Sequence, residues 1–140
     1  MGDLSNVGLV TSIYDAFVRG DVPAILKCLD PQAELIFEGS SAIPWSGNRR
    51  GHDGWLSFFQ AIGESLDDVT FAETMKPFAV QGDHVVFSGR YSARVKSTGK
   101  RIDSPLVHLW TLRNGNVVRC HELTNTALEA AACMTGTAAV

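Results

Sequence analysis

The feature of this sequence that most constrains the fold is a predicted β-hairpin near the C-terminal end. Two runs of residues that favour extended backbone, 106–112 and 117–124, flank the segment Arg113-Asn114-Gly115-Asn116. An Asn-Gly pair between such runs is the strongest short-range signal for a hairpin turn. Side chains alternate across a strand, so residues 106, 108, 110 and 112 share one face. Both faces are largely apolar, which predicts a strand covered on both sides, and His108 is the polar exception on its face.

Length and composition predict one globular domain over residues 1–140, with a core at about 5–130 and a flexible tail at 134–140. Charged residues make up 19% and the net charge is -3, so the chain lacks the excess of basic residues that is typical of nucleic-acid-binding proteins. No apolar run is long enough to cross a membrane and no signal peptide is visible, which predicts no membrane partner and a cytoplasmic location. The cysteines Cys28, Cys120 and Cys133 have no metal-ligand spacing, so we expect neither a disulfide framework nor a metal site.

Hydrophobic periodicity predicts the order of secondary structure along the chain. Helical spacing of apolar residues covers 4–19, a short segment capped by Asp21, and 52–66. Alternating patterns predict strands over 33–38, 69–80, 84–95 and 102–112 before the last strand of the hairpin, with a loop at 39–51 and a short helix at 127–133. This order predicts an α+β fold with helices gathered on one face of a mainly antiparallel sheet.

Four segments carry a resemblance to a known superfamily. They are Tyr14-Asp-Ala-Phe-Val-Arg-Gly-Asp21, Leu29-Asp-Pro-Gln-Ala-Glu-Leu35, the stretch from Trp45 to Phe59, and His108-Leu-Trp-Thr-Leu-Arg-Asn-Gly-Asn-Val117. With them the chain resembles the SnoaL-like and ketosteroid-isomerase-like proteins of the nuclear transport factor two-like superfamily. The resemblance implies a cone-shaped α+β barrel, in which a curved, mainly antiparallel sheet wraps round three N-terminal helices and encloses an apolar pocket. It also implies a homodimer formed through the sheet.

Three residues are candidate catalytic groups. Tyr14 matches the tyrosine with which the related steroid isomerases stabilise an oxyanion, although a core tyrosine bonded to backbone is the alternative. His108 matches the position of their second oxyanion donor and could donate a hydrogen bond or act as a base, unless neighbouring backbone satisfies it. Glu122 is predicted to pair with His108 across the hairpin, the alternative being a surface charge paired with Arg119 or Arg90.

The general base of the related enzymes is missing from its expected place. Where the steroid isomerases carry an aspartate, this chain has Phe37, and Glu38 points to the other face of the strand. The Arg-x-Asp pair of limonene-type epoxide hydrolases falls on Gly89 and Tyr91. Standard ketosteroid isomerisation and epoxide hydrolysis are therefore both disfavoured.

Aromatic residues complete the predicted pocket. We expect substrate-binding roles for Phe37, Trp45, Trp55, Phe58, Tyr91 and Trp110, with Trp45 alternatively plugging the core. The predicted function is binding of an apolar or aromatic small molecule, with proton transfer next to a carbonyl as in an isomerase, cyclase or lyase that uses no cofactor. The alternative is a ligand-binding or dimerisation module that has lost the general base. The uncharged strip at 107, 109 and 111 predicts the dimer contact.

Overall fold

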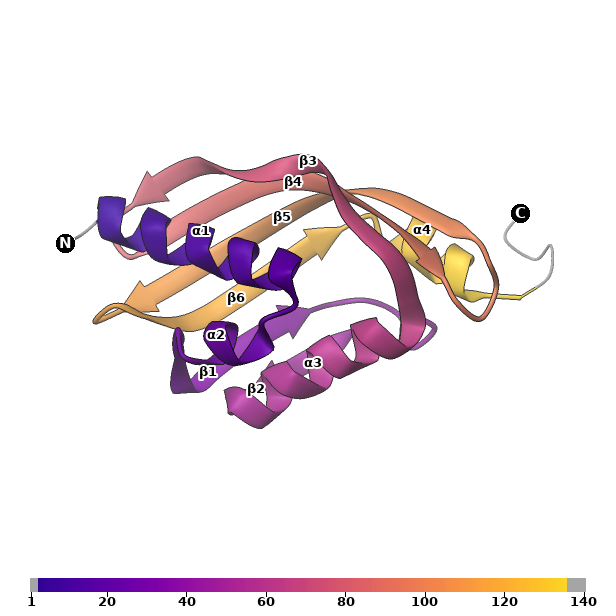
Figure 1. Cartoon of the computed structure of the whole chain (residues 1–140), viewed down its shortest axis with the longest axis horizontal. Helices are drawn as coiled ribbons and strands as arrows, with labels where there is room; N and C mark the ends of the chain where they lie inside the picture. The colour runs from indigo at the N-terminus through magenta and orange to yellow at the C-terminus, as the bar shows by residue number, and fades with distance from the viewer. Residues whose placement is uncertain (1–2, 136–140) are drawn as a thin grey trace.

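The computed structural model describes residues 3–135, and Figure 1 shows the arrangement of their elements. The described elements follow the predicted order with one additional strand. They are α1 (Asp3–Arg19), α2 (Val22–Leu26), β1 (Leu29–Phe37), β2 (Gly47–Arg50), α3 (Gly51–Ser65), β3 (Leu66–Gln81), β4 (His84–Val95), β5 (Arg101–Arg113), β6 (Asn116–Thr124) and α4 (Thr126–Cys133). Most of the predicted tail, residues 136–140, lies outside the described part of the chain.

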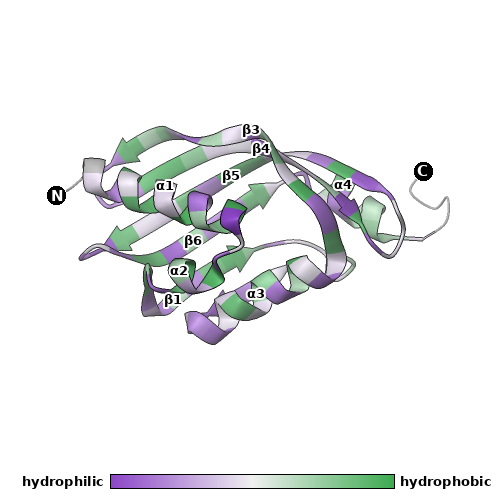
Figure 2. Cartoon of the chain, in the orientation of Figure 1, coloured by the Kyte–Doolittle hydropathy of each residue, from purple (hydrophilic) through white to green (hydrophobic). Residues whose placement is uncertain are grey.

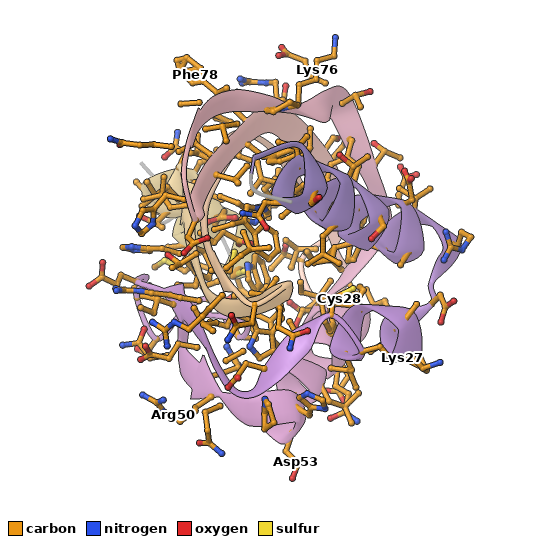
Figure 3. The ribbon with its side chains drawn as sticks, turned by 90° about the vertical axis from the view of Figure 1, so that its left-hand side faces the viewer. Lys27, Cys28, Arg50, Asp53, Lys76 and Phe78 are labelled. Atoms are coloured by element: carbon orange, nitrogen blue, oxygen red, sulfur yellow. The ribbon has the colours of Figure 1, made fainter. Side chains whose placement is uncertain are left out.

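The six strands form one curved sheet in the order β2-β1-β6-β5-β4-β3. All neighbouring strands run antiparallel except β1 and β6, which are parallel. Seen end on in Figure 3, the sheet curls around an interior filled with side chains, and α1, α2 and α3 lie across its open side. The predicted α+β cone is therefore confirmed, with a sheet that curves without closing.

Helix α1 is held on the sheet by one apolar stripe. Val10, Ile13 and Tyr14 are buried, as their three- and four-residue spacing predicts. The helix ends at Gly20, whose φ of +73° suits a residue without a Cβ. Asp21 then caps α2, because its carboxylate accepts a hydrogen bond from the Ala24 amide at 3.2 Å. Figure 2 shows hydrophobic positions, in green, along the strands behind α1.

The predicted hairpin is present as β5 and β6. Asn114 and Gly115 both have positive φ, +54° and +78°, as a type I′ turn requires. One extra residue in β6, Val118, shifts the register between Leu112 and Thr111, and the shifted register places His108 directly opposite Glu122. Along β5 the side chains alternate between two faces as predicted, with residues 106, 108, 110 and 112 buried. The second face is not covered within the single chain, where Leu109 is exposed.

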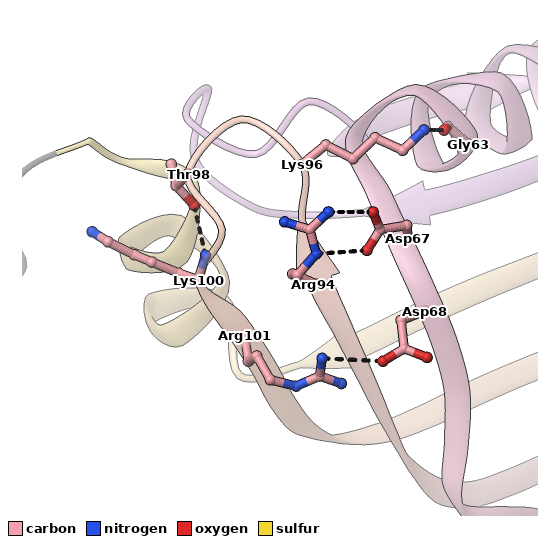
Figure 4. Close-up of polar contacts among 8 residues, drawn as sticks. All are labelled: Gly63, Asp67, Asp68, Arg94, Lys96, Thr98, Lys100 and Arg101. Atoms are coloured by element: carbon pink, nitrogen blue, oxygen red, sulfur yellow. Dashed lines mark hydrogen bonds and ion pairs between the residues drawn. The ribbon is translucent and has the colours of Figure 1, made fainter.

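An ionic cluster holds the start of β3, where the chain leaves α3 and turns along the edge of the sheet (Figure 4). The Arg94 guanidinium donates to both carboxylate oxygens of Asp67. Next to it, Arg101 donates to Asp68 at 3.1 Å, and Asp68 has the left-handed φ of +54°. Because the carboxylate accepts hydrogen bonds from Arg94, the pKa of Asp67 lies below its ordinary value. The cluster ties β3 to the ends of β4 and β5.

The strands differ from the sequence prediction in several places, including β3, which begins at Leu66 rather than at residue 69, and two further differences have a common cause. Residues 47–50, predicted as loop, form β2 because Gly47-Asn-Arg-Arg50 pairs with the outer edge of β1. Strand β1 begins at Leu29 rather than at residue 33, since Leu29 already pairs with Val117 of β6. In both places pairing with another strand overrides a local sequence of low strand preference.

Candidate active site

An apolar cavity of about 100 Å³ lies between the concave face of the sheet and the helices. Most of its lining consists of aliphatic and aromatic side chains. Among the lining residues, Tyr14, Tyr91, His108 and Glu122 carry hydroxyl, imidazole or carboxylate groups. An apolar cavity with a few convergent polar groups is typical of a small-molecule site.

The predicted aromatic residues fall into two groups. Trp45, Trp55, Phe58, Tyr91 and Trp110 all line the cavity. Trp45 is also 2% exposed, so it fills the core and lines the cavity at once. Phe37 is buried at the end of β1 but is not among the lining residues.

A continuous chain of hydrogen bonds joins four of the side chains that line the cavity. The Trp110 indole Nε1 donates to the Tyr14 hydroxyl oxygen at 3.0 Å. Tyr14 Oη lies 2.6 Å from His108 Nδ1, and His108 Nε2 lies 2.7 Å from Glu122 Oε1. The structure thus brings together all three candidate catalytic residues, Tyr14, His108 and Glu122.

The backbone explains why these groups meet. Glu122 stands opposite His108 in the hairpin, and directly opposed side chains on one face of an antiparallel pair lie within reach of each other. Trp110 follows two residues after His108 on the same face. Tyr14 reaches the group from α1, where its ring lies nearly parallel to the His108 ring with centroids 5.7 Å apart.

The hydrogen-bond partners decide between the alternatives for each residue. Tyr14 and His108 bond to side chains within the cavity rather than to backbone. Glu122 pairs with His108, whereas Arg90 pairs with Asp103 at 2.7 Å. The predicted His108–Glu122 pair is therefore confirmed.

Burial keeps Tyr14 protonated. Loss of solvent raises the pKa of Tyr14 well above its ordinary value, and the nearby Cys120 and Glu122 add to the increase. A neutral phenol is a hydrogen-bond donor, which is the form needed to stabilise a developing oxyanion.

In the part of the chain that the structure describes, no carboxylate takes the place of the aspartate that serves as general base in the steroid isomerases. Glu38, next to Phe37, has a largely exposed side chain and lies 3.4 Å from His121 Nε2 on the opposite face of the sheet. Glu38 therefore does not substitute for the missing aspartate. Among the described residues, Glu122 is the only carboxylate that lines the cavity.

The sequence analysis missed a second buried carboxylate, Glu129 on α4. Its side chain is completely buried and accepts hydrogen bonds from the hydroxyls of Tyr91 and Thr124. Burial raises the pKa of Glu129 to about 7, against the effect of these two donors and with a further increase from Glu122. The predicted helix at 127–133 contained the only sequence signal, a lone acidic residue among alanines.

Within residues 3–135 no group of three or more His, Cys, Asp or Glu side chains is arranged to hold a metal ion. In the same part of the chain, no helix is long and apolar enough to span a membrane.

Comparison with known proteins identifies relatives over most of the chain. The family model described as SnoaL-like domain matches residues 10–120. An uncharacterized protein of Mycobacterium tuberculosis is 27% identical over 122 residues, which cover 87% of this chain and 90% of that protein. The corresponding protein of Mycobacterium bovis matches equally well.

Solved structures have the same fold. An NTF2-like protein from Burkholderia xenovorans superimposes with a TM-score of 0.87 and 28% identity, covering 96% of this chain and 99% of that one. A proposed SnoaL-like polyketide cyclase from Jannaschia has a TM-score of 0.79 and 20% identity, covering 94% and 92% of the two chains. TerC, co-crystallised with polyporic acid, has a TM-score of 0.81 and 23% identity, covering 92% and 98%. At these low identities the last two similarities concern the fold alone.

Proposed function

The chain belongs to the SnoaL-like domain family, and from that starting point we propose that it catalyses proton transfer next to the carbonyl of an apolar small molecule. The observation that carries the proposal is the hydrogen-bonded chain Trp110–Tyr14–His108–Glu122 along the wall of an otherwise apolar cavity. In such a site a few polar groups orient the ligand and act with little competition from water.

The donors and acceptors along this chain support Tyr14 as the oxyanion donor. The Trp110 indole has only a proton to give, so the Tyr14 oxygen accepts it. If His108 is neutral, the Tyr14 proton points to Nδ1. If His108 is an imidazolium, both of its nitrogens donate, and the Tyr14 proton becomes free to turn to a ligand oxygen in the cavity.

The hydrogen bonds of His108 and Glu122 support Glu122 as the base. Both His108 nitrogens are engaged, so the imidazole relays charge between Tyr14 and Glu122 instead of touching a substrate. His108 holds Glu122 Oε1, while for Oε2 the described residues provide no hydrogen-bond partner. Glu122 Oε2 would take the proton from the carbon next to the carbonyl, the C–H electron pair would move to form the enolate, and Tyr14 would stabilise the oxygen. Return of the proton to carbon completes isomerisation.

Exchange of carbon-bound hydrogen for deuterium tests this proposal without the natural substrate. We expect the protein in heavy water to accelerate exchange next to the carbonyl of simple aryl ketones (acetophenone, propiophenone and tetralone), followed by proton NMR. Glu122→Gln should abolish the acceleration. Tyr14→Phe should lower it on the order of a hundredfold, as for loss of one oxyanion donor.

A matched histidine provides the control. His84→Ala removes an exposed imidazole from β4 and should leave the exchange rate unchanged, whereas His108→Ala should reduce it. If the ketones bind but no variant changes the exchange rate, the chain is a ligand-binding module without this chemistry. A rate in Glu122→Gln equal to that of the unaltered protein would contradict the base assignment.

We also propose a homodimer formed through the outer face of the sheet. Val107 and Leu123 face each other across β5 and β6, and Leu109 lies beside them. Leu109 and Leu123 are 38% and 44% exposed, which leaves an apolar patch on a sheet face without a covering helix. Sedimentation at micromolar concentration should give a dimer mass, and Leu109→Lys should give a monomer. A monomeric mass for the unaltered chain would rule this interface out.

A further inference from the structure

We propose that Tyr91 forms a second recognition point in the cavity, where its hydroxyl oxygen accepts a hydrogen bond from a ligand hydroxyl. The ligand class would then be an apolar hydroxy-ketone, with its carbonyl oxygen at Tyr14 and its hydroxyl at Tyr91. The assignment of the carbonyl end rests on the proposed function. The hydroxyl end rests on the separate contacts of Tyr91.

The partner of Tyr91 decides which way its proton points. Tyr91 lines the cavity and is 7% exposed. Its hydroxyl donates to Glu129 Oε2, while Thr124 donates to Glu129 Oε1. A phenol has one proton, so Tyr91 has only lone pairs left for a ligand when Glu129 is ionised.

Burying the Glu129 carboxylate costs solvation free energy that an apolar residue, packing α4 on the sheet, would not cost. A carboxylate removed from water loses several kcal/mol of solvation unless hydrogen bonds replace it. The other residues of α4 are mainly small and apolar, Thr126-Ala-Leu-Glu-Ala-Ala-Ala-Cys133, and an apolar residue at 129 would also pack against the sheet. What the carboxylate adds is a fixed orientation of the Tyr91 hydroxyl.

The two ends of the cavity therefore have opposite hydrogen-bonding character. At one end, the Tyr14 oxygen accepts from Trp110, and when His108 is an imidazolium it accepts from Nδ1 as well, which leaves the Tyr14 proton for a ligand. At the other end, the Tyr91 hydroxyl donates its hydrogen bond to Glu129, so the Tyr91 oxygen remains available as an acceptor. His108 pairs with Phe87, and Tyr91 lies four residues further along the same inward face of β4, about 13 Å by backbone spacing. A ligand with an acceptor at one end and a donor at the other matches this arrangement.

Two probes that differ only in a donor test the assignment. They are para-(hydroxymethyl)acetophenone and para-(methoxymethyl)acetophenone, which share the carbonyl and do not titrate near neutral pH. Their dissociation constants would be measured from the fluorescence of the tryptophans that line the cavity, at a pH about 1.5 above the pKa of about 7 of Glu129. We expect the unaltered protein to prefer the hydroxymethyl probe by roughly five- to tenfold, the value of one hydrogen bond.

Variants separate this inference from the proposed function. Tyr91→Phe should remove the preference and leave the affinity for the methoxymethyl probe nearly unchanged. Tyr14→Phe should weaken both probes equally and keep the preference. Thr124→Val is the matched control, because it removes the other donor to Glu129 from a residue outside the cavity lining and should retain the preference.

The outcomes that would overturn each idea are distinct. Equal affinity of the unaltered protein for both probes, or an unchanged preference in Tyr91→Phe, would refute the role of Tyr91 and leave the Tyr14 site standing. If neither probe binds, or if Tyr14→Phe binds both as the unaltered protein does, the carbonyl site itself is refuted. If Thr124→Val loses the preference as Tyr91→Phe does, the effect comes from the packing of α4, which also refutes the role of Tyr91.

Discussion

Replacing Glu129 with glutamine should change how the stability of this protein depends on pH. The pKa of Glu129 is raised from an ordinary 4.5 to about 7 by burial. Between these values the folded protein holds a proton that the unfolded chain has released. The free energy of unfolding therefore falls as the pH rises, and this contribution is present in full below pH 4.5 and lost above about pH 7.

The size of the effect follows from that interval. A difference from 4.5 to about 7 corresponds to about 3 kcal/mol. Glutamine keeps the shape of the side chain, and its amide can accept one hydrogen bond and donate the other, so Tyr91 and Thr124 retain partners. Glu129→Gln should thus gain stability relative to the unaltered protein as the pH rises, by about 2 to 3 kcal/mol over three pH units starting near pH 5.

Urea unfolding at several pH values measures this difference directly. Every other ionisable side chain is present in both proteins, so the difference between the two curves reports residue 129 together with the effect of its charge on neighbours such as Tyr91 and Cys133. At any single pH, the difference in unfolding free energy between the two proteins also includes the effect of altered packing. Only the way this difference changes with pH tests the raised pKa. Parallel curves over this range would refute the raised pKa and the burial of an ionisable carboxyl at this position.

Three glycines provide further predictions, all measured by urea or thermal unfolding. A Cβ at Gly89 would lie 2.7 Å from both the Glu73 carbonyl oxygen and Met75 Sδ, so Gly89→Ala should cost about 2 kcal/mol by forcing β3 away from β4. Gly63→Ala, in the last turn of α3 with open space around it, is the opposite case and should stabilise by about 0.4 to 1 kcal/mol. Gly115→Val meets open space as well, but its φ of +78° should make it cost about 1 to 2 kcal/mol; an unchanged stability would argue against the type I′ turn.

Much of the fold could be predicted because the relevant signals are local. The Asn114-Gly115 turn sets the hairpin and its first pairs, Arg113 with Asn116 and Leu112 with Val117. A register shift at Val118, which the sequence does not reveal, then brings Glu122 rather than His121 opposite His108. The apolar stripe of α1 likewise determines that Tyr14 faces the sheet. Tyr14 and His108 could be placed from the sequence because a periodicity or a turn close in sequence specifies each of them, whereas the place of Glu122 also needs the register shift.

Other features depend on partners that are distant in the chain. The strand at residues 47–50 exists only because the edge of β1 is available to pair with it. Phe37 has the right direction for the cavity by alternation and is buried, yet it does not line the cavity. Neither outcome can be read from local sequence.

The sequence by itself determined the hairpin, the amphipathic helices, and the inward direction of His108 and Tyr14, because turn geometry and side-chain alternation act over a few residues. The inward direction of Glu122 depends on the register shift at Val118, which belongs to the pairing of β5 with β6. Only the tertiary structure decided the hydrogen bonds that join these groups and the burial of Glu129 against Tyr91 and Thr124. Residues 91 and 129 are 38 positions apart, and their contact depends on how α4 packs on the end of the sheet. The cost of burying a charge depends on those surroundings, so the chemical character of the cavity arises at the level of packing.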